Sequence, residues 1–511
     1  MVDIMRTDEP QAIEPDKPAV APSLRGDMIR GSLWMVATRW VMRSIGLVGT
    51  IVLARLLVPE DFGLIAMAML VVGLLDILTS FGVDLALIRN TDAQRKHFDT
   101  AWTIQVMQGV MVAVALVAAA PFAAGYYGEP RIVPVMQILA LGVAAQGFNN
   151  IGVVAFRRDL NFVREFWFMV IKRLISFVVT VAVALIWRNY WALVTGVIAG
   201  QILGVVLSYA MHPYRPRFSL EAVGEVWSFS QWMLVINIGD YLYSKADEFI
   251  VAGVAGSKNL GVYTMASDIS NMPTTELVFP ISRALFPGYA KLAAEPQRFV
   301  YAYLNVLSFV VLFATGVGVG IAVVAHDLTV VVLGSKWLDA VPIIQWLALF
   351  GVIRAIYGQS GSVLTALGRV RSLSMLMWLQ LLCLIPLAAW AAVAVGIVGV
   401  AMVKVSIGLL FAFILFYALT RVLPISAMEI GDCLWRPALA GMAMVLAVNG
   451  LHAGPETSSA ISLARDVVVG AVTYSSVILL LWHLAGRPRG GEQFVLEIVG
   501  QRFKWMSKQW A

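Results

Sequence analysis

Long apolar stretches, each interrupted by only a few polar or charged residues, follow one another along most of the chain. Each is about as long as the roughly 20 residues that a helix needs to cross a bilayer, and none shows the alternation of a membrane β-barrel strand. Fourteen such stretches can be placed, at residues 32–57, 61–88, 99–124, 132–155, 166–187, 190–211, 227–254, 260–286, 300–323, 341–367, 373–394, 397–420, 434–451 and 465–485. The pattern predicts an all-α polytopic membrane protein with about 14 transmembrane helices.

Composition agrees with this pattern. Of the 511 residues, 60% are hydrophobic and 13% are charged, and the mean hydropathy of +0.81 is far above that of an ordinary soluble domain. Basic residues at the cytoplasmic ends of the helices explain the net charge of +6, so no nucleic acid is expected as a partner. Cys383 and Cys433 lie far apart, without the spacing of a metal site or a disulfide framework.

The distribution of Lys and Arg over the short connections predicts the orientation. One alternating set of connections carries fourteen basic residues, whereas the other set carries six when Arg55 at a helix end is included. The richer set consists of Arg89, Arg95, Lys96, Arg157, Arg158, Arg164, Arg215, Arg217, Lys291, Arg298, Arg369, Arg371, Arg421 and Arg436. Because basic connections stay in the cytoplasm, both termini are predicted to be cytoplasmic.

The chain contains a weak internal repeat. A shift of 198 residues places Ser32, Trp34, Met35, Gly63, Met67 and Ala68 on Ser230, Trp232, Met233, Gly261, Met265 and Ala266 without a gap, and a shift of 208 aligns residues 134–141 with 342–349. The matches bring spans 1, 2 and 4 into register with spans 7, 8 and 10. Two six-helix lobes in parallel tandem repeat are therefore predicted, related by an axis along the membrane normal and followed by two extra spans.

These features divide the chain into six parts. Residues 1–31 form a disordered cytoplasmic tail that lacks the apolar core of a signal peptide. Residues 32–211 form the N-lobe, 212–226 a cytoplasmic linker and 227–421 the C-lobe. Residues 434–485 hold spans 13 and 14. Residues 486–511 are predicted to form an amphipathic helix on the inner leaflet, with a disordered tail as the alternative.

Basic residues inside the apolar stretches are the first candidates for a functional site. Arg39 and Arg43 lie one helical turn apart on the first span, and a charge at bilayer depth costs about 2.5 to 3.5 kcal/mol, so both must face protein or water. Lys172 and Arg173 repeat this arrangement on span 5, nearer the surface, where snorkelling explains them equally well. Arg354 on span 10 extends the set.

Together with Lys404 on span 12, these groups predict a cationic lumen. Arginine grips phosphate and carboxylate oxygens with two parallel hydrogen bonds, so the lumen favours an anionic substrate. The structural alternative is that Arg39 and Arg43 pair with Asp76 or Asp84 of span 2 and only hold the bundle together.

Acidic residues within the spans are the candidates for ion coupling. Five of them are singled out: Asp76, Asp84, Asp240, Asp247 and Asp268. Buried carboxylates of transporters commonly bind a coupling proton or Na⁺. Ion pairs with the basic groups explain these residues about as well, and Lys245 is a candidate to neutralise one of them, so both readings stay open.

Span 8 carries the candidate gate. Pro273, Pro280 and Pro287 are spaced by seven residues and each removes a backbone hydrogen bond, so this helix is predicted to bend. A bending helix beside the lumen suits a gate, and a static kink is equally consistent with the sequence.

The motifs of enzymes are missing from the sequence. It contains no Gly-rich phosphate loop, no GxSxG and no HExxH, and its five histidines are scattered near span ends. The connections are too short to hold a catalytic domain. A transporter rather than an enzyme is predicted, with no metal and no cofactor.

A run in spans 1 and 2 is similar to a known family. The segments ARLLVPEDFGLIAMAMLVVGLLDILTSFGVDLALIR (54–89), FRRDLNF (156–162) and WALVTG (191–196) resemble the Wzx-type polysaccharide transport proteins of the multidrug/oligosaccharidyl-lipid/polysaccharide flippase superfamily. The resemblance implies a bacterial inner-membrane flippase for undecaprenyl-diphosphate-linked oligosaccharide, precursor of lipopolysaccharide or exopolysaccharide. It further implies two lobes that work by alternating access around a cationic cavity.

Three alternatives remain at this point. They are a drug/cation antiporter of the same superfamily, a flippase for the peptidoglycan lipid precursor, and a membrane glycosyltransferase or polymerase. The expected partners are the lipid-linked oligosaccharide and membrane lipids, with a polysaccharide polymerase and co-polymerase as candidates. The assignment of Arg39, Arg43, Lys172, Arg173 and Arg354 to the substrate rests on their positions and not on a family motif.

Overall fold

The computed structural model describes residues 22–79, 87, 94–159, 161–223, 230–273, 292, 295–451, 460–488 and 490–497. These residues form helices joined by short connections, with no strand among them. The first half contains α1 (Pro22–Leu56), α2 (Pro59–Thr79), α4 (Arg95–Tyr127), α5 (Ile132–Gly147), η1 (Ile151–Val154), α6 (Ala155–Arg158), α7 (Phe162–Trp187) and α8 (Trp191–Met211). The second half contains α10 (Ser230–Pro273), α12 (Pro296–Val323), α13 (Ala325–Leu328), η3 (Thr329–Leu333), η4 (Ser335–Ala340), α14 (Val341–Ala366), α15 (Val370–Ala394), α16 (Ile397–Val422), α17 (Ala427–Leu451) and α18 (Ala460–Leu484).

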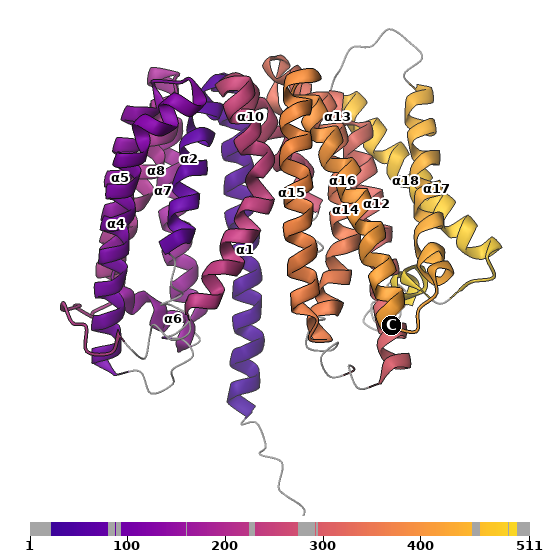
Figure 1. Cartoon of the computed structure of the whole chain (residues 1–511), viewed down its shortest axis with the longest axis horizontal. Helices are drawn as coiled ribbons and strands as arrows, with labels where there is room; N and C mark the ends of the chain where they lie inside the picture. Colours follow the sequence, from indigo (N-terminus) through magenta and orange to yellow (C-terminus); the bar gives the residue numbers. More distant parts are fainter. Residues whose placement is uncertain are drawn as a thin grey trace, which may run out of the picture.

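The helices pack into two groups that lie side by side (Figure 1). In the N-lobe, α1 packs on α7, α7 on α8, α8 on α5 and α5 on α4, while α2 contacts α4, α5 and α8. In the C-lobe, α10 packs on α14, α15 and α16, and α12 packs on α14. The helices α17 and α18 stand outside this group against α12. The two lobes that the sequence predicts are thus present, and α10 joins them along α2.

Ten helices among the described residues are long and apolar enough to cross a membrane, or eleven if α5 and the η1–α6 segment, which meet at 69°, form one span. The all-α membrane fold is therefore confirmed, whereas the count of fourteen is not. The helices α2 and α10 are outside this set, and both carry charged residues within their length.

The predicted spans 7 and 8 correspond to the two helical segments of α10, which are joined across a kink. Its break is at Gly256, whose φ of 77° and ψ of −179° only glycine adopts readily. Pro273 is the last residue of α10, and Pro280 lies outside the described residues. The observed bend is therefore produced by a glycine at the end of the bundle, and the proline gate stays a prediction.

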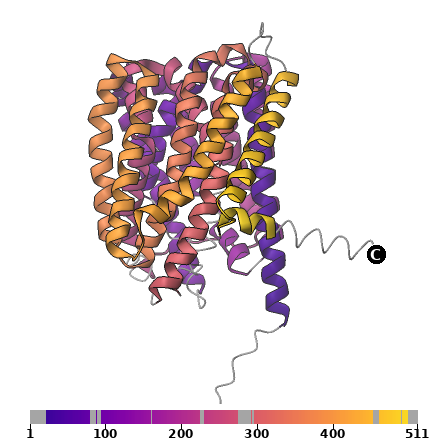
Figure 2. The same ribbon diagram turned by 90° about the vertical axis from the view of Figure 1, so that its right-hand side faces the viewer.

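Three further segments differ from the sequence-based expectation or refine it. The helix α1 begins at Pro22, ten residues before the predicted span, because a helix can continue beyond the apolar run. Its lower part projects from the bundle (Figure 2).

The linker lies on α4, where the backbone amides of Arg217 and Ser219 donate to Asp99 and Thr103.

The first residues after α18 pack on α12 and α17. Glu492 forms a buried ion pair with Arg436 of α17 at 2.7 Å, and the amide of Gly491 donates to the Ser308 hydroxyl of α12 at 2.9 Å. Residues 498–511 of the predicted amphipathic tail lie outside the described part. A buried carboxylate needs a charged partner, so this pair fixes where the chain turns back after α18.

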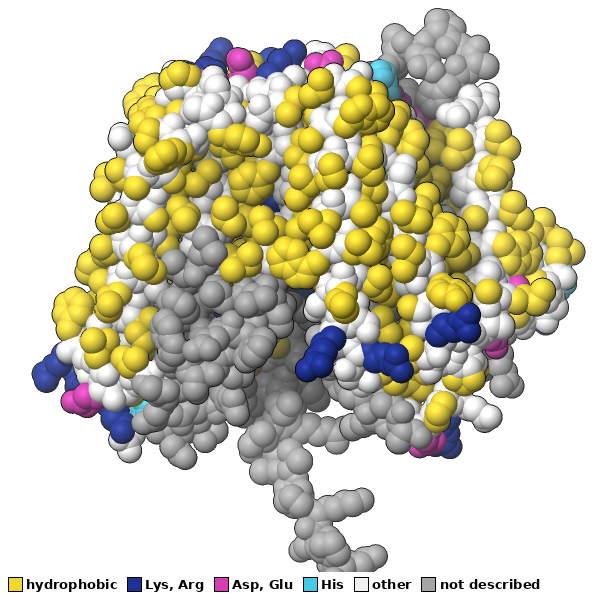
Figure 3. All heavy atoms as spheres, in the orientation of Figure 1, with side chains coloured by type: hydrophobic (Ala, Val, Ile, Leu, Met, Phe, Trp, Pro, Cys, Tyr) yellow, Lys and Arg dark blue, Asp and Glu magenta, His cyan; other side chains and the backbone are white. Residues whose placement is uncertain are grey.

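The outer surface has the polarity of a membrane protein. Hydrophobic side chains cover the flank of both lobes, while most charged side chains visible in this view lie along its two ends (Figure 3). Large apolar side chains such as Phe122 and Ile186 are 79% and 76% exposed. Lipid chains can cover such a band without the cost of exposing it to water.

Candidate functional site

The candidate site is a groove between α1, α6 and α7 at one end of the N-lobe. Its volume is about 750 Å³, and it is lined by Met35, Thr38, Arg39, Met42, Arg43, Arg157, Phe162, Glu165, Met169 and Arg173. Four arginines and one glutamate give these side chains a net charge of +3. The methionines supply flexible apolar surface. The groove is therefore suited to an amphiphile with an anionic group.

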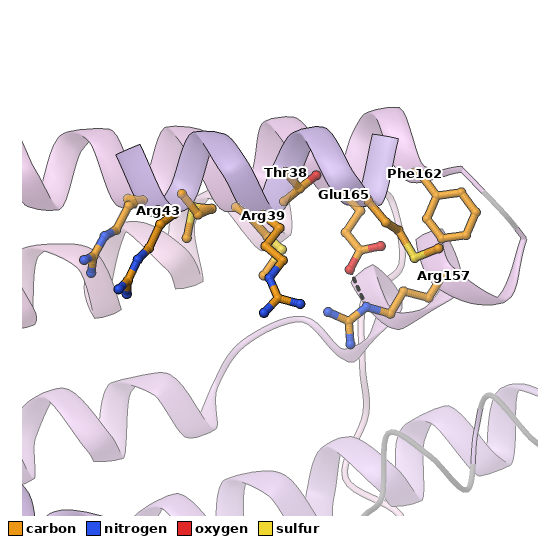
Figure 4. A pocket seen from close by; sticks show the side chains of 10 residues that line it. Thr38, Arg39, Arg43, Arg157, Phe162 and Glu165 are labelled. Atoms are coloured by element: carbon orange, nitrogen blue, oxygen red, sulfur yellow. Dashed lines mark hydrogen bonds and ion pairs between the residues drawn. The ribbon is translucent and has the colours of Figure 1, made fainter. Parts of the chain in front are cut away.

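The helix α1 presents one face to the groove and another to the lipid. Thr38, Arg39 and Arg43 lie within two turns on the groove side, and the labelled arginines project into the same space (Figure 4). Trp40, about a quarter turn away, is 62% exposed on the outer surface. The four-residue spacing of Arg39 and Arg43 predicts that these two side chains share one face of α1.

The helix α7 provides the opposite wall. Its first turn is capped by Asn161, whose side-chain oxygen accepts a hydrogen bond from the amide of Arg164 at 3.4 Å. Further along, the guanidinium of Arg173 lies across Gly46 of α1, where an added Cβ would be 3.3 Å from it. The small residue at position 46 thus lets the Arg173 guanidinium lie close against α1.

The structure places Lys172 elsewhere. Its side chain lies along Gly204 of α8, 3.2 to 3.3 Å from the position of a Cβ there, and it is not part of the groove lining. Neighbouring residues of a helix point about 100° apart, and here Lys172 points toward Gly204 of α8 while Arg173 points toward Gly46 of α1. Arg39, Arg43 and Arg173 are thus brought together, and Lys172 does not belong to this set.

Arg157 and Glu165 belong to the groove and are absent from the predicted site residues. Arg157 of α6 forms an ion pair with Glu165 of α7 (Figure 4). The signal in the sequence was the FRRDLNF segment, but only the turn between α6 and α7 brings its first arginine over the groove.

Asp247 is the one predicted acidic residue that is buried within the described part of the chain, and it lies on the first segment of α10. Asp247 is completely buried, forms an ion pair with Lys404 of α16 and accepts a hydrogen bond from the hydroxyl of Tyr263 at 2.7 Å. On the same segment of α10, Lys245 forms an ion pair with Glu248 at 2.6 Å. For Asp247 and Lys404, this arrangement matches the structural ion-pair alternative.

Arg354 lies in a second polar group of the C-lobe. Two tyrosines, Tyr243 and Tyr357, form this group, and their hydroxyl oxygens are 2.5 Å apart. The positive charge of Arg354 acts on both hydroxyl groups. The charge of Asp240 also acts on the Tyr357 hydroxyl. Arg354 is therefore placed with these residues and not in the arginine groove.

The remaining acids lie on more open surface. The side chains of Asp76 and Asp268 are both exposed within the described part of the chain, and Asp84 lies outside it. The positive charges of Lys245 and Arg43 both act on Asp268.

The two lobes are in close contact at the end of the bundle away from the groove, where α2 of the N-lobe meets α10. We call this contact the seam. Here α2 crosses the bend of α10, labelled near the top of Figure 1. A Cβ on Gly63 would lie 1.7 Å from the carbonyl oxygen of Ser257, and one on Gly261 would lie 1.9 Å from that of Pro59. Gly63 and Gly261 are the residues that the 198-residue repeat aligns, so equivalent glycines of the two lobes meet here.

Side chains seal the seam on both sides of the glycines. Trp337 of η4 is completely buried and donates from Nε1 to the carbonyl oxygen of Ala54 at 2.9 Å. On the other side Ser257 lies 3.3 Å from the carboxylate of Glu129. Hydrogen bonds from Arg131 hold the pKa of Glu129 below its usual range, so it remains an acceptor at neutral pH.

Comparison with known proteins places these features in a family. A sequence profile described as Polysaccharide biosynthesis protein matches residues 52–342. The lipopolysaccharide biosynthesis protein WzxC of Escherichia coli (strain K12) is 25% identical over 68% of this chain and 72% of its own length. The teichuronic acid biosynthesis protein TuaB of Bacillus subtilis (strain 168) is 25% identical over 89% of this chain and 95% of its own. The succinoglycan biosynthesis transport protein ExoT of Rhizobium meliloti (strain 1021) is 23% identical over 88% of this chain and 92% of its own length.

Solved structures share the fold. The lipid II flippase MurJ in an inward closed conformation has a TM-score of 0.70 and 13% identity, covering 89% of this chain and 100% of that one. An inward-facing multidrug resistance MATE family transporter of the MOP superfamily has a TM-score of 0.60 and 15% identity, covering 77% and 95%. At such identity the likeness concerns the fold. Because the family profile matches more than half of the chain, this protein belongs to the polysaccharide biosynthesis protein family, as the resemblance in its sequence predicted.

Proposed function

We propose that this protein is a flippase that moves an oligosaccharide linked to undecaprenyl diphosphate across the bacterial inner membrane. The observation that carries the proposal is the groove in which Arg39, Arg43, Arg157 and Arg173 converge. A diphosphate presents oxygens that match the forked donors of arginine. WzxC, TuaB and ExoT, which carry biosynthesis or transport of polysaccharide in their names, support the substrate class.

Alternating access explains how the groove and the seam work together. The groove lies at the end whose connections are rich in Lys and Arg, which is the cytoplasmic end by the positive-inside rule. The seam then closes the periplasmic end, so the lipid diphosphate enters from the cytoplasm. Opening of the seam and closing of the groove would release it on the other side, with both termini remaining in the cytoplasm.

The rival functions make different demands on the groove. A drug/cation antiporter has to attract cations, whereas the groove lining carries a net charge of +3. A flippase for the peptidoglycan precursor uses the same diphosphate chemistry and differs in the glycan. Sugar transfer catalysed by the purified protein would instead favour a glycosyltransferase or polymerase.

The direct test is transport of a fluorescent undecaprenyl-diphosphate oligosaccharide in proteoliposomes. Arg39→Gln and Arg43→Gln are each expected to weaken substrate binding about 10- to 100-fold, because a hydrogen bond to a charged group contributes about 1.5 to 3 kcal/mol. Lys172→Gln is the matched control, since it removes a positive charge from the adjacent helix outside the groove lining. Equal transport by all three variants at equal protein amount would contradict the proposed role of the arginines.

Ion coupling is proposed for the exposed carboxylates rather than for Asp247. Asp240 and Asp268 have exposed side chains, whereas Asp247 is engaged by Lys404 and Tyr263. We expect Asp268→Asn to reduce the response of flipping to an imposed proton or Na⁺ gradient. Flipping by the unchanged protein that ignores both gradients would exclude a coupling role for these residues.

A further inference from the structure

Glu165 is the one carboxylate among the ten residues that line the groove in the described part of the chain. It lies in the first turn of α7, and its side chain is 15% exposed. Its partner Arg157 comes from α6 and is 53% exposed. An acidic side chain in the first turn is also stabilised by the positive end of the helix dipole. The carboxylate is thus held firmly while its arginine partner remains accessible from the groove.

The ion pair with Glu165 engages an arginine side chain that an anionic substrate would otherwise bind. In Figure 4 Glu165 and Arg157 point toward each other beside Arg39. The Glu165 carboxylate and a phosphate present similar oxygens to a guanidinium, so both compete for the same donors. Glu165 accepts from Nε of Arg157, so a phosphate that binds the guanidinium in bidentate fashion through its Nε edge must displace the carboxylate.

We propose that Glu165 is an internal anion that competes with the diphosphate of the substrate for Arg157 and thereby sets the affinity of the groove; this rests on the proposed function. When the substrate binds, Arg157 exchanges the carboxylate for phosphate oxygens. When the substrate leaves, Glu165 pairs with Arg157 again. A transporter has to release what it binds, and an internal competitor shortens the time for which a strongly anionic group stays in a groove of net charge +3.

The competing explanation is that the pair only ties α6 to α7. The two explanations differ in what removal of the carboxylate does to affinity. Loss of a tie would lower the thermal stability of the protein and leave diphosphate binding unchanged or weaker. Loss of a competitor makes binding tighter and release slower, and this gain requires Arg157.

The experiment measures binding of farnesyl diphosphate to the full-length protein in nanodiscs. Glu165→Gln is expected to lower the Kd about fivefold, which corresponds to the upper range for a partly exposed ion pair. Glu165→Asp, which keeps the charge on a shorter side chain, is expected to give an intermediate Kd and serves if the glutamine variant folds poorly. In the Arg157→Gln background, Glu165→Gln is expected to give no gain.

The matched control is Glu295→Gln. Glu295 forms an ion pair with Arg298 at 2.9 Å outside the groove lining, so its removal is expected to leave the Kd unchanged. If the unchanged protein binds farnesyl diphosphate and flips its lipid substrate, but neither Glu165 variant binds more tightly, the competitor role is overturned and the flippase function stands. If the unchanged protein neither binds the diphosphate nor flips the lipid, both proposals are overturned.

Discussion

Gly63→Ala is expected to open the seam between the lobes. The added Cβ would lie 1.7 Å from the carbonyl oxygen and 2.6 Å from the carbonyl carbon of Ser257, and 2.9 Å from the amide nitrogen of Gly261. All three are backbone atoms, so no side chain can rotate away. Overpacking of this kind costs about 1 to 3 kcal/mol, and it falls on the closed state alone because α2 and α10 belong to different lobes. The closed population is therefore expected to fall about 5- to 150-fold relative to the open one.

Labelling of a cysteine at position 257 measures this shift. In a chain whose Cys383 and Cys433 are replaced by alanine, Ser257→Cys is expected to be protected from a membrane-impermeant maleimide, because Ser257 is 7% exposed in the closed seam. Adding Gly63→Ala is expected to make it reactive.

The control for this experiment is Gly125→Ala in α4. A Cβ there meets no atom within 4 Å, so the protection of the cysteine at position 257 is expected to persist. Transport should fall in the Gly63→Ala variant, since a transporter that cannot close one side cannot complete its cycle. Unchanged protection in a well-folded Gly63→Ala variant would show that the glycine crossing does not hold the seam closed.

Lys404→Met is expected to destabilise the C-lobe by about 3 to 5 kcal/mol, the usual cost of leaving one member of a buried ion pair without its partner. Asp247 is completely buried and Lys404 is 9% exposed, so water cannot replace the lost ammonium without opening the packing of α10 on α16. Tyr263 supplies one remaining hydrogen bond to the carboxylate, which does not compensate its charge.

A double substitution separates this effect from a general loss of packing. Asp247→Leu combined with Lys404→Met is expected to recover most of the stability, because an apolar pair of similar volume replaces a buried ion pair at little or no cost. Lys258→Met provides the surface control. The side chains of Lys258 and its partner Asp339 are 61% and 63% exposed, and such an exposed ion pair contributes about 0 to 1 kcal/mol to stability. Thermal unfolding in detergent gives the comparison. A Lys404→Met variant as stable as the unchanged protein would refute the structural role of the pair.

Much of the fold follows from local patterns in the sequence. Apolar stretches of about 20 residues determine helices that can cross a bilayer, and the spacing of Arg39 and Arg43 places both on one face of α1. The repeat also aligned Gly63 with Gly261, which the structure brings together at the seam. The predicted spans at 227–254 and 260–286 leave a connection at 255–259, and the break of α10 at Gly256 lies inside it.

The candidate site was only partly predictable. Sequence spacing selected Arg39, Arg43 and Arg173, but it equally selected Lys172, which packs against Gly204 of α8. It left a coupling role and an ion pair both open for Asp247 and placed Lys404 in the lumen, and the structure pairs these two residues inside the C-lobe. Spacing along one helix identifies residues that share a face, but it cannot say which neighbouring helix that face meets.

The sequence by itself thus determined the membrane helices, the repeat and the arginine stripe of α1, since each depends on residues close together in the chain or on its exact periodicity. Only the tertiary structure decided that α6 carries Arg157 to Glu165, that Trp337 reaches Ala54, and that the groove and the seam lie at opposite ends. Those contacts join residues that are distant in sequence or separated by a turn. Their geometry is set by the packing of whole helices and leaves no local pattern from which it could be predicted.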